Sequence, residues 1–229
     1  VLVYHGLDER YPYASDRFHT FILEGARDVQ KELDARGIFY ALNVRREGHR
    51  EDNALEKLAE RAALVVTEEM PIDPLRGLTS RLAARIESDT PLVTVDTACV
   101  IPMPSLRKGY DRAFAFRKGT ADLLAERLTR PWDEVEPKVR FEDHPALPFE
   151  PVDIERASIP ELIAWCDIDH GVGPVPHTRG GSRAGYARWE SFRSNHLSRY
   201  HRRRNDPSDL EAVSRMSAYL HFGHVAPTR

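Results

Sequence analysis

The sequence predicts a doubly wound α/β fold built on a parallel sheet, followed by a long linker and the first helices of an all-helical domain. Short apolar runs rich in β-branched residues alternate with amphipathic helical patterns over the first 130 residues. Strands of that kind, separated by helices, are typical of a parallel sheet covered on both faces. The composition then becomes acidic and rich in proline, and later rich in arginine. We therefore expect three parts, at 1–130, 131–178 and 179–229.

Each element of the first part follows from spacing. Apolar residues recur at helical intervals, and short apolar runs lie between them. The opening VLVYHGL is typical of a strand entered in mid-domain, so we expect residues upstream and one mainly parallel sheet that lacks its first strand. Gly37 is placed where the first helix should stop. The expected helices are 18–33, 55–62, 75–86 and 111–128, and the later strands are 38–44, 64–66 and 92–95.

The second part has the composition of an extended linker. Between Trp132 and Asp169 there are 11 acidic residues against Lys138, Arg140 and Arg156, and prolines recur throughout. Such sequences favour extended, solvated chain. One short helix is expected at 159–165.

The third part begins with a helix that is rich in arginine. Gly180-Gly181-Ser182 should start it, with Ser182 as the N-cap, and it should run to about Arg203. Eight arginines lie between 179 and 204 against one acid at 190. Because aromatic residues are interleaved, the segment favours nucleic acid or a phosphate-bearing cofactor over a merely solvated face. We expect its arginines on one solvent-exposed face, with Trp189 and Phe192 turned inward.

Several classes of function find no support in the sequence. No G-x-G-x-x-G follows an expected strand, and there is no Walker motif. The ten histidines lack metal-ligand spacing. Glu68, Glu69 and Asp96 lie at strand ends, where α/β sheets bind ligands, but solvated carboxylates are equally common there. Two cysteines form no disulfide framework, and no apolar run approaches the ~20 residues of a membrane span. A monomer in the cytoplasm is expected.

The stretch from Tyr200 to Arg229 is the most specific part of the chain. It reads YHRRRNDPSDLEAVSRMSAYLHFGHVAPTR and contains Y-x-x-x-R-N-x-P followed by V-S-R-M-S-A-Y-L-H-F-G. Hydroxyl groups and backbone N–H groups at a helix start suit a phosphate, because unpaired N–H groups and the helix dipole both favour an anion.

These motifs resemble the flavin-binding signature of the DNA photolyases and cryptochromes. The helix pattern GG-S-x-A-x-x-A-R-W-x-x-F is similar to the one that opens their helical domain. Features nearer the start resemble class II cyclobutane-dimer photolyases: Asp8-Glu9 with Tyr11-Pro12, Arg17 to Gly25, Asp73 to Arg76, Val95-Asp96 running on to Pro102, and the spacing of Lys108, Tyr110 and Arg117.

The resemblance implies light-driven repair of cyclobutane pyrimidine dimers in UV-damaged DNA by electron transfer from reduced FAD. It implies DNA contact by Arg204 and, in addition to FAD, a possible antenna chromophore of unknown identity. The electron-relay residues would lie beyond Arg229, so the segment is expected to be inactive alone, and no protein partner is indicated. The residues that the resemblance assigns to FAD are Tyr200, Val213, Ser214, Arg215, Met216 and Ser217.

Three departures from the family pattern fall in the run V-S-R-M-S-A-Y-L-H-F-G. Val213 replaces a hydroxyl residue, Met216 replaces leucine and Ala218 replaces proline. Two other functions remain open: a cryptochrome-like flavin photoreceptor without repair activity, and an α/β nucleotide-binding protein without flavin.

Overall fold

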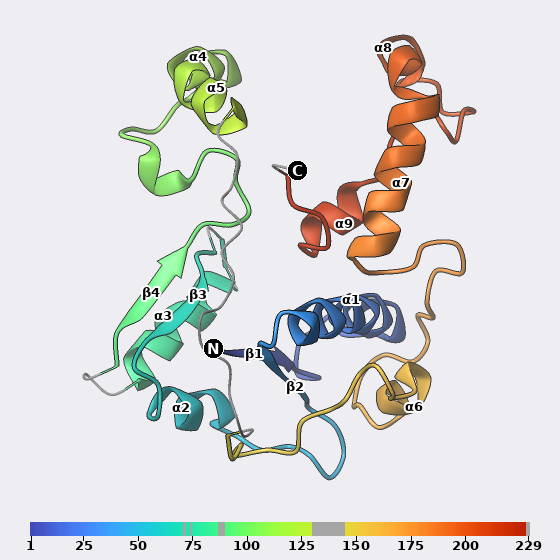
Figure 1. The fold of residues 1–229 in the computed structure, drawn as a ribbon. Coiled ribbons are helices and arrows are strands. Elements are labelled where there is room, and N and C mark those ends of the chain that lie inside the picture. The colour runs from blue at the N-terminus through green and yellow to red at the C-terminus, as the bar shows by residue number, and fades with distance from the viewer. Residues whose placement is uncertain (71, 74, 87–89, 130–144, 228–229) are drawn as a thin grey trace. The chain divides into compact units, whose positions relative to one another are not determined.

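A computed structural model describes residues 1–70, 72–73, 75–86, 90–129 and 145–227 (Figure 1). The chain divides into two compact units. The first combines Val1–Glu51 with Glu136–Val225, and the second combines Asp52–Val135 with Ala226–Arg229.

The first unit is built on a parallel pair of strands covered by one long helix. Strand β1 (Leu2–Leu7) pairs with β2 (Phe39–Val44) from Leu2 opposite Phe39 to Leu7 opposite Val44. Helix α1 (Asp16–Ala35) connects them. The Ser15 hydroxyl caps its start by accepting from the Phe18 N–H, and Gly37 follows its end with a φ of 67°, which glycine adopts without steric cost. The expected helix and both strands are confirmed.

The described part of the predicted linker belongs to the core of this unit. Ile154 is fully buried, and Ile159, Ile163 and Cys166 are nearly so, in one cluster with residues of α1, β1 and β2. Helix α6 (Ile159–Ala164) lies here, as the sequence predicts. The expectation of an extended, solvated linker is wrong for this stretch, because its apolar residues cover the sheet between the prolines. Residues 131–144 lie outside the described residues.

Side chains of α1 fasten this stretch to the helix. The Arg27 guanidinium donates to the carbonyl oxygens of Ile154 and Ala157 at 2.9 and 2.8 Å. Gln30 binds the Asp153 carboxylate through its amide nitrogen and accepts from the Ile154 N–H through its oxygen. Backbone groups that a linker would leave to water therefore have partners within the protein.

The second unit contains another parallel pair. Strand β3 (Val65–Glu68) pairs with β4 (Leu92–Val95). Helix α2 (Ala54–Ala59) precedes β3, and helix α3 (Leu75–Arg85) connects β3 to β4. The prediction of parallel strands is confirmed. The prediction of one continuous sheet is not, because no hydrogen-bonded ladder joins the two pairs among the described strands.

The helix expected at 111–128 is two helices. After a short 3-10 turn, η1 (Met103–Ser105), come α4 (Ala113–Gly119) and α5 (Ala121–Thr129). Thr120 separates them with a φ of −118°, which is not helical, and its hydroxyl donates to the Phe116 carbonyl at 2.8 Å.

The helix expected at 182–203 is also interrupted. Helix α7 (Ser182–Asn195) ends at His196, whose φ of −128° is not helical, and η2 (Leu197–Arg199) and α8 (Tyr200–Arg203) follow. Helix α9 (Ser217–His221) is the last element. Among the helices described, none combines the length and the apolar character needed to cross a membrane.

Candidate functional site

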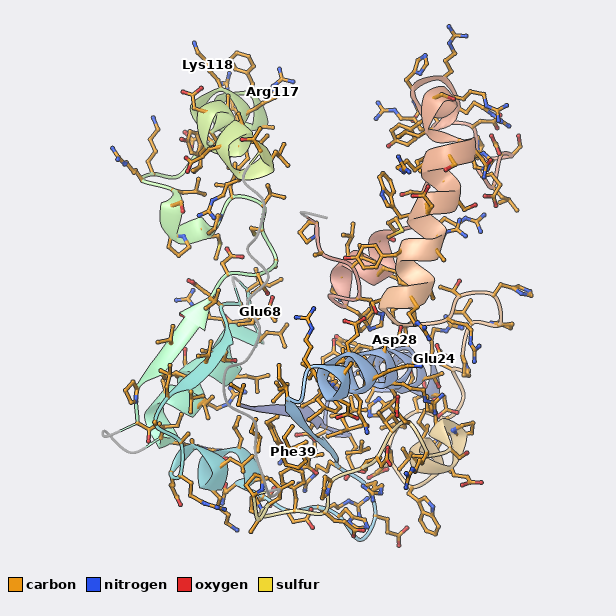
Figure 2. The ribbon with its side chains drawn as sticks, in the orientation of Figure 1. Glu24, Asp28, Phe39, Glu68, Arg117 and Lys118 are labelled. Atoms are coloured by element: carbon orange, nitrogen blue, oxygen red, sulfur yellow. The ribbon has the colours of Figure 1, made fainter. Side chains whose placement is uncertain are left out.

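The acidic face of α1 holds the start of α7. Figure 2 shows Glu24 and Asp28 on the side of α1 that faces the first turn of α7. The Glu24 carboxylate accepts from the Gly180 N–H at 2.6 Å, and the Asp28 carboxylate accepts from the Arg183 N–H at 3.0 Å. Residues four apart share one helix face, so α1 presents both carboxylates together. Asp28 thereby satisfies an N–H group that the helix start leaves unpaired, Glu24 satisfies the N–H group just before the helix, and both charges complement the helix dipole.

The prediction of Ser182 as the N-cap is therefore wrong. Gly181 occupies that position with a φ of 101°, which is strained for any residue with a side chain. Ser182 is the first helical residue, and its hydroxyl hydrogen-bonds to Glu32 of α1 at 3.1 Å. The sequence pattern alone places the cap one residue late because the capping carboxylate comes from a distant helix.

A histidine after α9 joins α1 to the start of α7. The His224 ring stacks on Phe21 with centroids 4.7 Å apart, and its Nδ1 accepts from the Gly181 N–H at 2.9 Å. It lies directly over Gly25, where a Cβ atom would come within 2.3 Å of Nε2. Burial lowers the pKa of His224 to about 4. The ring is therefore neutral at pH 7, as its accepting Nδ1 requires.

The predicted cofactor run, Val213–Ser217, is an irregular turn leading into α9. Arg215 has a φ of 54°, which is uncommon for a residue other than glycine, and Met216 returns to a helical conformation. Met216 is buried with Tyr219 and Val225, while Val213 and Ser217 are exposed. The Met216 side chain thus anchors the turn, and the backbone on either side of it stays accessible.

The backbone donors of this run are unused. Among the described residues, no acceptor is found for the N–H groups from Val213 to Ser217, nor for the hydroxyl groups of Ser214 and Ser217. Backbone N–H groups in a turn of changing handedness can form a concave anion-binding surface. The run therefore has the donors that a phosphate requires.

The two remaining predicted residues lie on α8 and directly after it. Tyr200 is 36% exposed and meets the Phe192 ring edge-on, and the Arg204 guanidinium lies 5.9 Å from the centre of the Tyr200 ring. Arg204 is exposed, as a DNA contact requires. Within the described residues no hydrogen bond or ring contact joins Tyr200 to the Val213–Ser217 run. Of the predicted site residues, Val213–Ser217 form one continuous turn, whereas Tyr200 contacts Arg204 and not that turn.

The arginines of α7 do not all share one solvent-exposed face, contrary to the prediction. Arg188 is half-buried, and its Nε donates to the Ser214 carbonyl at 2.9 Å. Phe192 is buried and Trp189 packs against the cluster around Met216, so the inward orientation of both aromatics is confirmed. Helical spacing alone could have placed Arg188 near the apolar side of α7, since it lies four residues before the buried Phe192.

The carboxylates at the strand ends have structural partners. The Thr97 hydroxyl donates to Glu68 at 2.5 Å, and Asp96 accepts from the N–H groups of Cys99 and Met103. Asp96 therefore shapes the loop after β4. Within the described ranges no group of histidine, cysteine and acidic residues could hold a metal ion.

Comparisons with known proteins find that the chain is similar to photolyases in sequence and in fold. It is 27% identical over 227 residues to the deoxyribodipyrimidine photo-lyase of Methanothermobacter thermautotrophicus, covering 99% of this chain and 47% of the relative. It is 28% identical over 222 residues to that of Oryza sativa, covering 91% of this chain and 41% of the relative. The chain therefore spans about half the length of the curated relatives it matches. No family model matches it.

The fold is shared with a solved structure. The archaeal photolyase from Sulfolobus tokodaii, crystallised with two FAD molecules, matches with a TM-score of 0.58 at 17% identity, covering 99% of this chain and 46% of that chain.

Proposed function

We propose that this chain, which is similar to photolyases in sequence and in fold, forms part of an enzyme that repairs UV-damaged DNA with light, using reduced FAD. The observation that carries the proposal is the run of unused backbone donors at Val213–Ser217. In the family this run contacts the phosphates and ribitol of FAD, and here it has N–H and hydroxyl groups to do so.

The residues present fit a phosphate group. Anions bind well where several backbone N–H groups are unpaired, and the run also carries the Arg215 cation. Val213 supplies a backbone donor but no hydroxyl group. We propose that Ser214 to Ser217 hold the diphosphate and that Tyr200 contacts the same cofactor.

The protein's own residues bind, orient and exclude water, while the flavin supplies the redox chemistry. Bound in its reduced form, FAD would supply the light-excited electron that opens the cyclobutane ring and would take the electron back. Arg204 would contact the DNA backbone, where a damaged base is easier to unstack than a normal one. We further propose that the substrate is the cyclobutane pyrimidine dimer and that the subgroup is class II, on the motifs between Asp8 and Arg117. A second, light-harvesting chromophore belongs to the same proposal.

The test uses the longest natural chain that contains this sequence. Its absorption spectrum should show bound flavin, and irradiated DNA should lose dimers in light but not in the dark. Bound flavin without dimer loss would favour a cryptochrome-like photoreceptor, and the absence of flavin would favour a plain nucleotide-binding protein. Either result would contradict the proposal.

We expect Arg204→Ala to weaken binding to dimer-containing DNA in that protein and to reduce the slope of log K against log salt by about one phosphate contact. The exposed guanidinium can neutralise a phosphate and release its counterion. Arg156→Ala is the control, since its side chain is 90% exposed and pairs with Asp153 far from the candidate site in sequence. An unchanged slope for the Arg204 variant would exclude a phosphate contact.

A further inference from the structure

We infer that Arg188 is part of the cofactor site: it fixes the Val213–Ser217 run and contributes phosphate contacts of its own. This inference rests on the proposed function. Sequence reasoning groups Arg188 with the arginines that would face DNA. The structure instead points its guanidinium at the run that is proposed to hold FAD.

The bond from Arg188 fixes the least regular part of the run. Its Nε donates to the Ser214 carbonyl, and the next residue is Arg215 with its φ of 54°. A positive φ costs a residue with a side chain on the order of 1 kcal/mol or more, so it persists only where neighbouring contacts hold it. Arg188 supplies such a contact on one side, and the buried Met216 supplies another.

The face of α7 that carries Arg188 is held close to α9. Gly185 lies one turn earlier, and a Cβ atom there would come within 2.5 Å of Val225 and 2.9 Å of Tyr219. Residues three apart share a helix face, so Arg188 continues the surface that meets the segment around α9. The position of its guanidinium therefore depends on helix packing as well as on one hydrogen bond.

Most of the hydrogen-bonding capacity of Arg188 is free. In the part of the chain that the structure describes, only its Nε has an acceptor, and no carboxylate pairs with its charge. On the same helix Arg193 binds Glu190, while Arg179, just before it, pairs with Glu24. A guanidinium with two free amino groups binds phosphate in a bidentate manner.

Together, Arg188 and the run supply converging donors of two kinds. The N–H groups of Val213–Ser217 suit one phosphate, and the free amino groups of Arg188 add a full charge beside them. FAD carries two linked phosphates, whereas riboflavin carries none. Arg188 should therefore distinguish the two ligands, which a purely structural residue would not do.

The experiment compares Arg188→Met, Arg188→Lys and Arg193→Met in the longest natural chain that contains this sequence. Affinities for FAD and for riboflavin are measured on the apoprotein by flavin fluorescence, and thermal unfolding is recorded alongside. Arg188→Met should weaken FAD binding by about 10–100-fold, the range for lost charge-assisted hydrogen bonds. Riboflavin binding should change by about threefold or less. Arg188→Lys should recover part of the loss, because it keeps the charge but not the forked geometry. Arg193→Met should leave both affinities unchanged.

Each outcome separates this inference from the proposed function. If the unmodified protein binds FAD and Arg188→Met binds it equally well, the role of Arg188 is refuted and the function stands. If FAD and riboflavin are weakened equally, Arg188 is only structural and the inference fails. If the unmodified protein binds no FAD, both the proposed function and this inference are refuted.

Discussion

Replacing Gly25 with alanine should lower the free energy of unfolding by about 2–4 kcal/mol, although alanine is the better helix former by about 1 kcal/mol. The new Cβ atom would lie 2.3 Å from Nε2 of His224, closer than any real contact. The ring must then move, which disturbs its stack on Phe21 and its bond to the Gly181 N–H. Overpacking costs about 1–3 kcal/mol, and an unpaired buried N–H adds about 1–3 kcal/mol more.

Gly77→Ala is the matched control, because Gly77 also lies within a helix. Its nearest foreign atom is the flexible end of Arg81, 3.2 Å from the new Cβ position. This variant should therefore gain up to about 1 kcal/mol from helix propensity. The free energy of unfolding of both variants is measured in urea. A Gly25→Ala protein as stable as the unmodified one would show that His224 is not packed over α1.

Acid should destabilise the first unit through His224. Burial holds its pKa at about 4, below the ordinary value of 6.5. Between these values the unfolded chain takes up a proton that the folded chain does not, so stability falls as the pH drops from about 6.5 to 4. One unit of pKa corresponds to about 1.4 kcal/mol, and solvent screening of this partly exposed ring reduces the total, so the expected loss is on the order of 2–3 kcal/mol. Asp28 opposes the shift in the pKa and His5 reinforces it, but burial is the larger effect.

His224→Gln separates this contribution from those of other groups. A glutamine oxygen can accept from the Gly181 N–H but takes up no proton in this range, so the loss of stability on acidification should be smaller in this variant than in the parent. His5 and His19 also have pKa values lowered by burial and should leave a remaining decline of the same sign. Unfolding free energies measured between pH 4 and 8 give the comparison. Identical pH profiles for the variant and the parent would contradict the assignment.

The sequence predicted the elements more accurately than their partners. The stripe from Phe18 to Leu33 predicted α1 because periodicity is local information. A local pattern also predicts Ser182 as the N-cap of α7, yet the carboxylate that caps this helix belongs to Asp28. No local pattern reveals a partner some 150 residues away. The linker shows a related limit: its prolines and acids are visible in composition, but the burial of Ile154 depends on α1 and the sheet.

The candidate site divides in the same way. The motif singles out the run from Val213 to Ser217, whose backbone N–H groups have no acceptor among the described residues, and its role in binding FAD stays a prediction. It could not indicate that Arg188 turns toward Ser214, because that depends on how closely α7 approaches α9. The packing of two helices decides which arginine side chains remain in solvent and which turn toward the Val213–Ser217 run.

The division of the first unit into two stretches of chain has a consequence for biosynthesis. Val1–Glu51 belongs with Glu136–Val225, so α1 leaves the ribosome well before the helix whose start it holds. At about 5–20 residues per second, the wait is on the order of ten seconds. During that time Leu23 and Ala26, later buried against the returning segment, have no such cover. Closing so long a loop is also slow compared with local helix formation. The intervening unit can fold first, while these apolar residues of the amino-terminal stretch still lack the segment that later covers them.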